Sequence, residues 1–264
     1  MKRRIEHSPV AFSIIFTFTL AVVLGIISAL VSAVFPQGES DAVYLVMALV
    51  NLIIGAAAIF LFGVINGCNS LAHVFNTKGL VKGFNALYPV MGIFVLNLLL
   101  TASNVSYIST ENIGRLPVVV LMQGASALMQ TVLFRGLLIT ALFIKMSETK
   151  NARLRSIFIA SALFLVMYIP MSILNTGGLE LMNLMNTFII SAGMCAAYMY
   201  GKRLLPLIIV QGTWQVLGGV ISVLSVSEEV GIDPAAGFIF LLFLAIVLVV
   251  AIIVGKRADA FEKI

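Results

Sequence analysis

Acidic residues and histidines are absent from the interior of every long apolar stretch of this sequence. The chain contains 11 Asp and Glu residues and 2 His among 264 residues, and all of them lie in or beside short polar segments. A membrane-embedded carboxylate pair, a Ser–His dyad and a His-Glu-x-x-His zinc site are therefore excluded. The two cysteines, Cys68 and Cys195, form neither a Cys-x-x-Cys pair nor a disulfide framework. We expect no metal and no cofactor.

Charged residues are also scarce. They make up 10% of the chain, against 61% hydrophobic residues and a mean hydropathy of +1.13. Soluble domains are about 25% charged, so the sequence predicts an all-α, polytopic membrane protein with a single transmembrane domain over residues 1–264. A spanning helix needs about 20 mostly apolar residues. Eight stretches meet this need, namely 10–34, 42–65, 85–102, 117–145, 155–175, 180–200, 204–225 and 236–254.

The placement of charges predicts the orientation of these helices. With the N-terminus in the cytoplasm, the inner loops hold every basic residue except Arg115 and Arg135. The outer loops hold most of the acidic residues, namely Glu39, Asp41, Glu111, Glu180, Glu228, Glu229 and Asp233. This arrangement satisfies the positive-inside rule, so we expect a multi-pass plasma-membrane protein with both termini cytoplasmic. Because the basic residues are spread over short loops, we expect the lipid bilayer and no nucleic acid as a partner.

One cation lies inside a predicted span. Arg135 is about ten residues from the inner end of the stretch 117–145, a depth of about 15 Å at about 1.5 Å per residue. A charge at this depth is costly and marks a candidate functional site. Since no span offers a carboxylate, we expect the guanidinium to bind carbonyls, amides, hydroxyls or water, with Gln130 and Thr131 nearby. Arg135 either ties helices together through backbone carbonyls or binds a ligand directly.

Two other predicted spans carry pairs of residues that are one helical turn apart. Gln211 and Gln215 share a face of the seventh span, and amides in this position should bond across the bundle. Phe164 and Tyr168 share a face of the fifth span, where an aromatic pair usually packs against neighbours. Each pair can be interpreted in two ways. Its side chains either make contacts between helices or contact a bound ligand, which we call the guest.

The fourth span resembles a motif of the CPBP family, which comprises the type II CAAX endopeptidases and the bacteriocin-processing and immunity proteins of the Abi group. Members of that family carry the motif Glu-Glu-x-x-Phe-Arg-Gly on their fourth helix. Here Phe134, Arg135 and Gly136 match, while Gln130 and Thr131 occupy the positions of the two glutamates. The resemblance implies a CPBP-like intramembrane protease bundle.

Two further motifs of that family follow in the same order. The second family motif is Phe-x-x-x-His. In this sequence Phe164 matches the phenylalanine and Tyr168 replaces the histidine. The third family motif is His-x-x-x-Asn, which follows a Leu-x-Pro stretch. In this sequence Gln211 replaces the histidine and Gln215 replaces the asparagine. The resemblance covers a CPBP-like core of roughly residues 115–220. Every departure falls on a residue that the family uses for chemistry.

The resemblance implies that, in active members, a glutamate activates water while histidine and asparagine stabilise the oxyanion. Peptide hydrolysis needs a proton acceptor, and neither Gln130 nor Thr131 can accept a proton near pH 7. The sequence therefore predicts a pseudoprotease whose groove holds a partner's transmembrane helix or a lipidated peptide. The side chains expected to contact this guest are those of Arg135, Phe134, Phe164, Gln130, Gln211 and Gln215.

Two other functions remain open at the level of the sequence. An active intramembrane endopeptidase of the CAAX or bacteriocin-processing type would need a base from an outer loop, and Glu111 and Glu180 are the candidates. A small-solute transporter subunit would use Arg135 to contact an anion. Immunity against a bacteriocin is a further possible function that only the family resemblance suggests.

Overall fold

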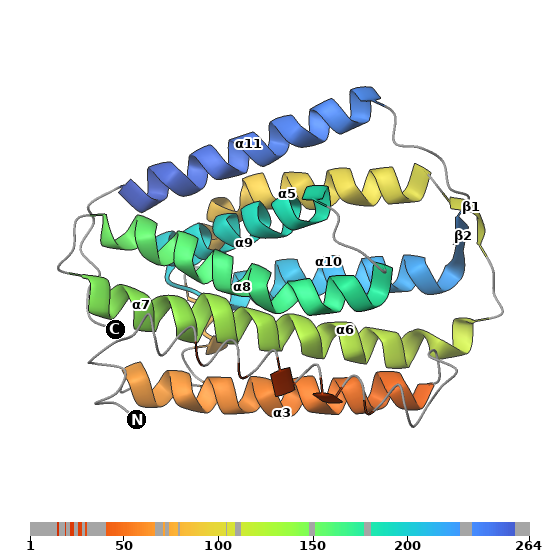
Figure 1. Cartoon of the computed structure of the whole chain (residues 1–264), viewed down its shortest axis with the longest axis horizontal. Coiled ribbons are helices and arrows are strands. Elements are labelled where there is room, and N and C mark those ends of the chain that lie inside the picture. The colour runs from red at the N-terminus through yellow and green to blue at the C-terminus, as the bar shows by residue number, and fades with distance from the viewer. Residues whose placement is uncertain are drawn as a thin grey trace.

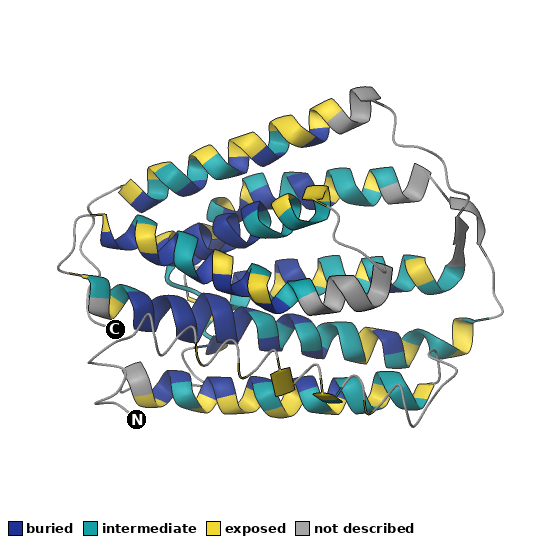
Figure 2. Cartoon of the chain, in the orientation of Figure 1, coloured by how far each residue is buried: buried dark blue, intermediate teal, exposed yellow. Residues whose placement is uncertain are grey.

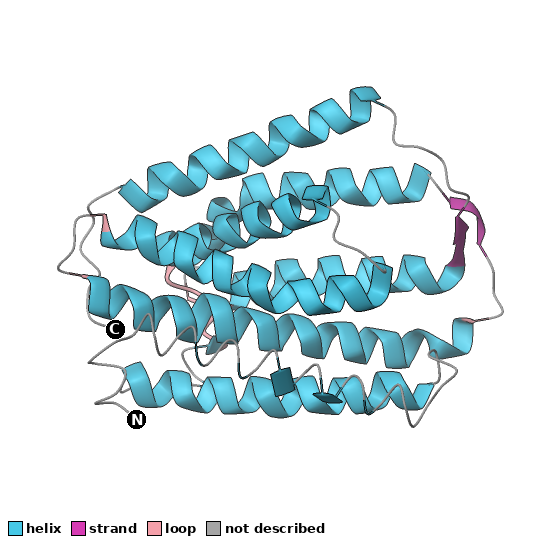
Figure 3. Cartoon of the chain, viewed as in Figure 1, coloured by secondary structure: helices cyan, strands magenta, loops and turns pink. Residues whose placement is uncertain are grey.

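The structure is a computed structural model of the whole chain. It describes residues 41–66, 71, 74–78, 80–103, 105–108, 112–147, 151–176, 181–227 and 234–256, together with a few residues between 15 and 30. Helices dominate this part of the chain and run roughly along the long axis of the molecule (Figures 1 and 3). In the view of Figure 1, α3 and α11 form the two edges, and the other helices lie between them.

Seven helices in the described residues are long and apolar enough to cross a membrane. Each agrees with one predicted span, so the expectation of an all-α, polytopic membrane protein is confirmed. The predicted first span, 10–34, lies almost entirely outside the described residues. The helices are α3 (Asp41–Asn66), α5 (Leu80–Ser103), the continuous rod of α6 (Leu116–Gln130), η2 (Thr131–Leu138) and α7 (Ile139–Met146), α8 (Ala152–Thr176), α9 (Leu181–Gly201), α10 (Leu205–Leu224) and α11 (Pro234–Lys256).

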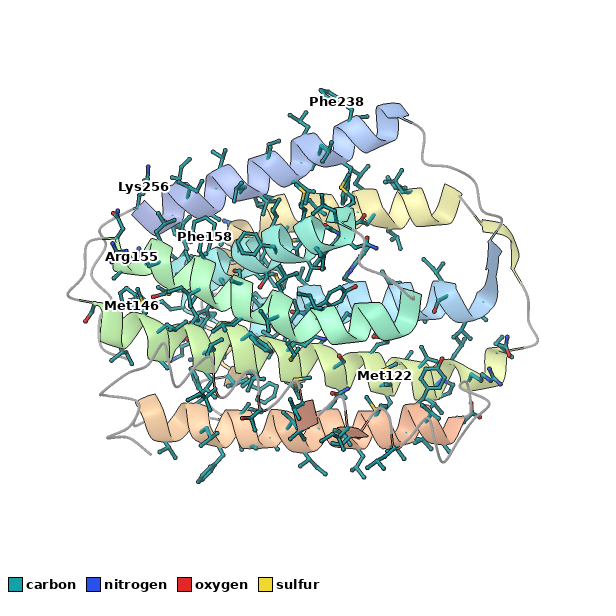
Figure 4. The ribbon with its side chains drawn as sticks, viewed as in Figure 1. Met122, Met146, Arg155, Phe158, Phe238 and Lys256 are labelled. Carbon is teal, nitrogen blue, oxygen red and sulfur yellow. The ribbon has the colours of Figure 1, made fainter. Side chains whose placement is uncertain are left out.

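The edge helices expose large apolar side chains. On α3 these include Ile53 and Phe60, which are 61% and 68% exposed, and on α11 they include Phe238, at 69%. Figure 2 shows exposed residues along both helices, and in Figure 4 Phe238 points away from the bundle. A continuous apolar surface of this kind is unfavourable in water but is the normal outer surface of a membrane protein.

The middle of the fourth span is buried on every side. Its central segment η2 is a π-helix whose eight residues are all buried, and it contacts α3, α8, α9 and α10. The backbone N–H of Ile139 donates to the carbonyl of Phe134, five residues back. The sequence predicts an uninterrupted α-helix over 117–145, so the π segment is a departure from that prediction. Such segments occur frequently at functional sites.

Close helix packing depends on small residues, as two glycines illustrate. At Gly193 of α9, a Cβ atom would lie 2.5 Å from Cγ1 of Val247 and 2.7 Å from Cγ2 of Val90. The glycine therefore lets α9 approach α5 and α11 closely. At Gly136 of η2, a Cβ would lie 3.0 Å from Cδ1 of Leu204, so this glycine accommodates the residue that precedes α10.

One end of the bundle contains structure that the sequence does not predict. A short antiparallel ribbon pairs β1 (Val105–Ile108) with β2 (Ser225–Ser227). A 3₁₀-helix, η1 (Ile113–Arg115), precedes α6 at this end. There Nε of Arg115 lies 3.7 Å from Oδ1 of Asp41, at the start of α3. Both side chains are partly exposed, so this ion pair adds little stability.

Candidate functional site

Four polar side chains from two packed helical rods meet in one hydrogen-bonded group, which we call the amide cluster: Gln130 and Thr131 from the fourth span, and Gln211 and Gln215 from α10. The Oε1 atom of Gln130 accepts hydrogen bonds from Nε2 of Gln211 at 2.6 Å and from Nε2 of Gln215 at 2.9 Å. Oγ1 of Thr131 donates to Oε1 of Gln211 at 3.0 Å. The two glutamines of α10 therefore bond across the bundle, as their spacing predicts.

The cluster extends by one residue that the sequence does not single out. Nε2 of Gln130 donates to Oγ of Ser126 at 3.0 Å, one turn earlier on α6. The four-residue spacing is the available signal for this contact, but serine is common in helices and the spacing alone is weak. With Ser126 included, both ends of the Gln130 amide are held in place.

The amide cluster contains no charged group and no group that can take up a proton near pH 7. Its members are amides and hydroxyls, and each bond in it joins a neutral donor to a neutral acceptor. An amide oxygen has two lone pairs, and both sites on Gln130 Oε1 already receive a donor. One buried acceptor in the cluster, Oε1 of Gln215, has no hydrogen-bond partner.

Arg135 lies beside the cluster and is only 2% exposed. Its Nη1 donates to the backbone carbonyl of Gln130 at 3.2 Å, a type of partner that the absence of carboxylates predicts. Its Cζ lies 4.2 Å from the ring centroid of Phe164 on α8, a cation–π contact. Phe134 and Phe164 pack edge to face, with centroids 5.1 Å apart. The buried Nε of Arg135 has no hydrogen-bond partner.

A second neighbour of Arg135 has no signal in the sequence. Cys195 of α9 is fully buried near Arg135, where α9 packs against η2. Further along the same interface, the hydroxyls of Thr140 and Tyr198 are 3.3 Å apart. These contacts depend on how α9 packs against η2 and α7, and no spacing in a single sequence reveals that packing.

The other sequence candidates do not join the cluster. Tyr168 is half-buried on α8, and no hydrogen bond or ring contact in the described structure connects it to the amide cluster. Glu111, Glu180 and both histidines lie outside the described residues. Within the described residues, no group of His, Cys, Asp and Glu side chains could hold a metal ion.

The predicted guest contacts differ in their accessibility. Gln130 and Gln215 are half-buried. The side chains of Arg135, Phe134, Phe164 and Gln211 are no more than 7% exposed. The two half-buried amides are therefore the most accessible of these groups, and the guanidinium of Arg135 lies against the Phe164 ring.

The comparison with known protein families agrees with the resemblance seen in the motifs. The model of the type II CAAX prenyl endopeptidase Rce1-like family matches residues 112–217. The matched segment includes α6, η2, α7, α8, α9 and most of α10, and thus every residue of the amide cluster. No curated protein and no solved structure matches the chain. This segment, which is less than half of the chain, is therefore similar to the Rce1-like type II CAAX prenyl endopeptidases of the CPBP family.

Proposed function

We propose that this chain is a catalytically inactive member of that family, a pseudoprotease that holds a partner's transmembrane helix or a lipidated peptide within the bilayer. The amide cluster is the observation that carries the proposal. It stands where the family motifs place two glutamates, a histidine and an asparagine. Its residues bond to one another, and none of them can take a proton from water.

The geometry of the cluster argues against hydrolysis by another route. A general base contributes about 10²–10⁴-fold to a rate, and the two residues at the glutamate positions are an amide and a hydroxyl. Thr131 already donates its proton to Gln211. Each amide nitrogen of Gln211 and Gln215 already donates one of its two N–H groups to Gln130, so at most one N–H of each remains for a developing oxyanion.

Two unpaired atoms support a role in binding. Oε1 of Gln215 is a buried acceptor and Nε of Arg135 is a buried donor, and both lack a partner. Within a bilayer, an extended peptide needs outside partners for its own N–H and C=O groups, whereas a helix satisfies them internally. A lipidated peptide would therefore pair with both atoms once the side chains that enclose them move aside, while a transmembrane helix would use them only through polar side chains.

The test is a binding and cleavage assay with the purified chain in lipid nanodiscs. The probe is a farnesylated CAAX peptide that carries a photoreactive group. We expect the probe to crosslink to the protein without release of its C-terminal tripeptide, as measured by mass spectrometry. Gln215→Leu removes the unpaired acceptor and should weaken crosslinking about threefold to tenfold, the range for one hydrogen bond.

A matched control is available on α9. Asn186 also has a buried side-chain oxygen without a partner, but it lies outside the amide cluster, so Asn186→Leu should leave crosslinking unchanged. Release of the tripeptide that disappears in Gln130→Ala would show an active enzyme and refute the proposal. Equal crosslinking in wild type and Gln215→Leu would refute the binding role for the peptide. The same comparison with a photoreactive single-span helix tests the other guest.

A further inference from the structure

A crevice of about 270 Å³ lies between α5, α9 and α11, and none of the amide cluster residues lines it. Its volume is close to the lower end of ligand pockets, about 300–1,000 Å³, and well above the roughly 30 Å³ of one water molecule. Its lining is mostly apolar and includes Ala86 from α5, Ala197 from α9 and Ile253 from α11. The crevice is therefore suited to a hydrocarbon chain.

The shape of the crevice follows from small residues on α9. At Gly193, which lines it, α9 touches Val90 and Val247 closely enough that even a Cβ would clash. Beyond this point the side chains of Ala196 and Ala197 are too short to fill the space between the three helices. The result is a crevice that is narrow at Gly193 and extends toward the ends of α9 and α11.

Exposed cations flank that end of the crevice. Nζ of Lys82 lies 5.2 Å from the ring centroid of Tyr200, and Tyr200 lines the crevice. Lys256, also exposed, ends α11 one turn after the lining residue Ile253. The single carboxylate within the described residues is that of Asp41, which lies beside Arg115 at the opposite end of the bundle. The mouth of the crevice is thus cationic, with no described acid near it.

We propose that this crevice binds one anionic phospholipid of the bilayer. An acyl chain occupies the apolar space along Ala197 and Ile253, and the phosphate lies between the ammonium groups of Lys82 and Lys256. An apolar slot with cations at its outer end matches both the tail and the headgroup of such a lipid, and basic pockets between spans bind anionic headgroups. Tyr200 supports this arrangement because its ring holds the Lys82 ammonium at the mouth. The proposal does not depend on the pseudoprotease function.

The charge contribution is tested by lipid retention. The full chain is reconstituted with equal amounts of phosphatidylglycerol and phosphatidylcholine and extracted into mild detergent, and bound lipid is measured by native mass spectrometry. We expect one phosphatidylglycerol to be retained in preference to phosphatidylcholine. Lys82→Gln should weaken this retention about fivefold, since one surface cation contributes about 1 kcal/mol to binding of anionic lipid. The control Lys78→Gln removes an exposed cation that precedes α5, whereas the cation over the Tyr200 ring is Lys82, so this variant should have little effect.

The contribution of the apolar space is tested by filling it. Ala86 is half-buried and lines the crevice, whereas Val81 on the same helix is 73% exposed and does not. Ala86→Phe should abolish retention, and Val81→Phe should preserve it. Equal retention of the two lipids by wild type, or unchanged retention in Ala86→Phe, would overturn the proposal. If Ala86→Phe lowers the melting temperature, the comparison of Lys82→Gln with Lys78→Gln decides the question alone.

Discussion

At the scale of single residues, the site is organised around Gln130. Its side chain accepts from two glutamines of α10 and donates to Ser126, and its backbone carbonyl accepts from Arg135. No other residue of the amide cluster makes contacts in so many directions. Buried polar groups inside a low-dielectric bundle are costly when they lose a partner, so the cluster depends most on this one residue.

Replacement of Gln130 should therefore destabilise the bundle more than replacement of Gln215. Gln130→Leu leaves two amide nitrogens of α10 without acceptors, and we expect a loss of about 1–3 kcal/mol in the free energy of unfolding. Gln215→Leu removes one bond and also removes an unpaired oxygen, so its cost should be about 0.6 kcal/mol. Thermal unfolding of both variants in the same detergent gives the comparison. An equal or larger effect of Gln215→Leu would contradict the central place of Gln130.

Arg135 should not tolerate lysine, although lysine keeps the charge. The flat guanidinium lies over the Phe164 ring while Nη1 reaches the Gln130 carbonyl, and an ammonium cannot do both in the same geometry. We expect Arg135→Lys to cost about 1–2 kcal/mol of stability, the range for a desolvated cation–π contact. Arg155→Lys is the control, since Arg155 is exposed at the end of the bundle (Figure 4). Similar melting temperatures for the two variants would show that the ring contact contributes nothing.

The sequence predicts the polar members of the site better than their surroundings. The four-residue spacing places Gln211 and Gln215 on one face, and the absence of carboxylates requires Arg135 to bind neutral groups; both features are present in the structure. The neighbourhood of Cys195 depends on contacts between helices far apart in sequence, which periodicity does not encode. The contact of Phe164 with Arg135 is not predicted by helical spacing, but the family motifs bring the two residues into one site.

At the scale of helices, hydropathy alone predicts that each membrane-spanning helix exists and roughly how long it is. Seven predicted spans agree with helices of the structure to within five residues. Two local features are not predictable in this way. The π-helix at Thr131–Leu138 arises within a continuous apolar run, where hydropathy does not distinguish α from π hydrogen bonding. The ribbon of β1 and β2 pairs segments that are distant in the chain, and each strand is too short to show alternation.

The contact of α9 with its two neighbours provides a prediction about helix packing. Gly193→Ala places a methyl group within 3 Å of side chains from both α5 and α11, so the helices must separate, at a cost of about 1–3 kcal/mol. Gly218 of α10 is a matched control, because a Cβ there meets no atom within 4 Å. Gly218→Ala should be neutral or stabilising by up to about 1 kcal/mol, as expected from helix propensity. Melting temperatures that fall equally in both variants would show that Gly193 is not a close contact.

At the scale of the whole molecule, charge separates the two ends of the bundle. The described basic residues at the ends of α5, α8, α9 and α11 lie together, as the labelled positions of Arg155 and Lys256 illustrate (Figure 4). The other end, with the ribbon and η1, holds Asp41 and only one described cation, Arg115, which pairs with it. This separation is what the positive-inside rule requires, and it places the proposed lipid crevice and the predicted cytoplasmic surface at the same end.

Cysteine labelling in intact cells tests this orientation. Asp41→Cys and Lys256→Cys place thiols at exposed positions on opposite ends of the bundle, in a background where Cys68 is serine; the native Cys195 is fully buried. A membrane-impermeant maleimide should label position 41 from outside, and position 256 only after the membrane is opened. The reason is that moving the basic end outward would place its lysines and arginines on the disfavoured side. Labelling of position 256 in intact cells, with position 41 protected, would reverse the orientation and move the anionic-lipid site to the outer leaflet.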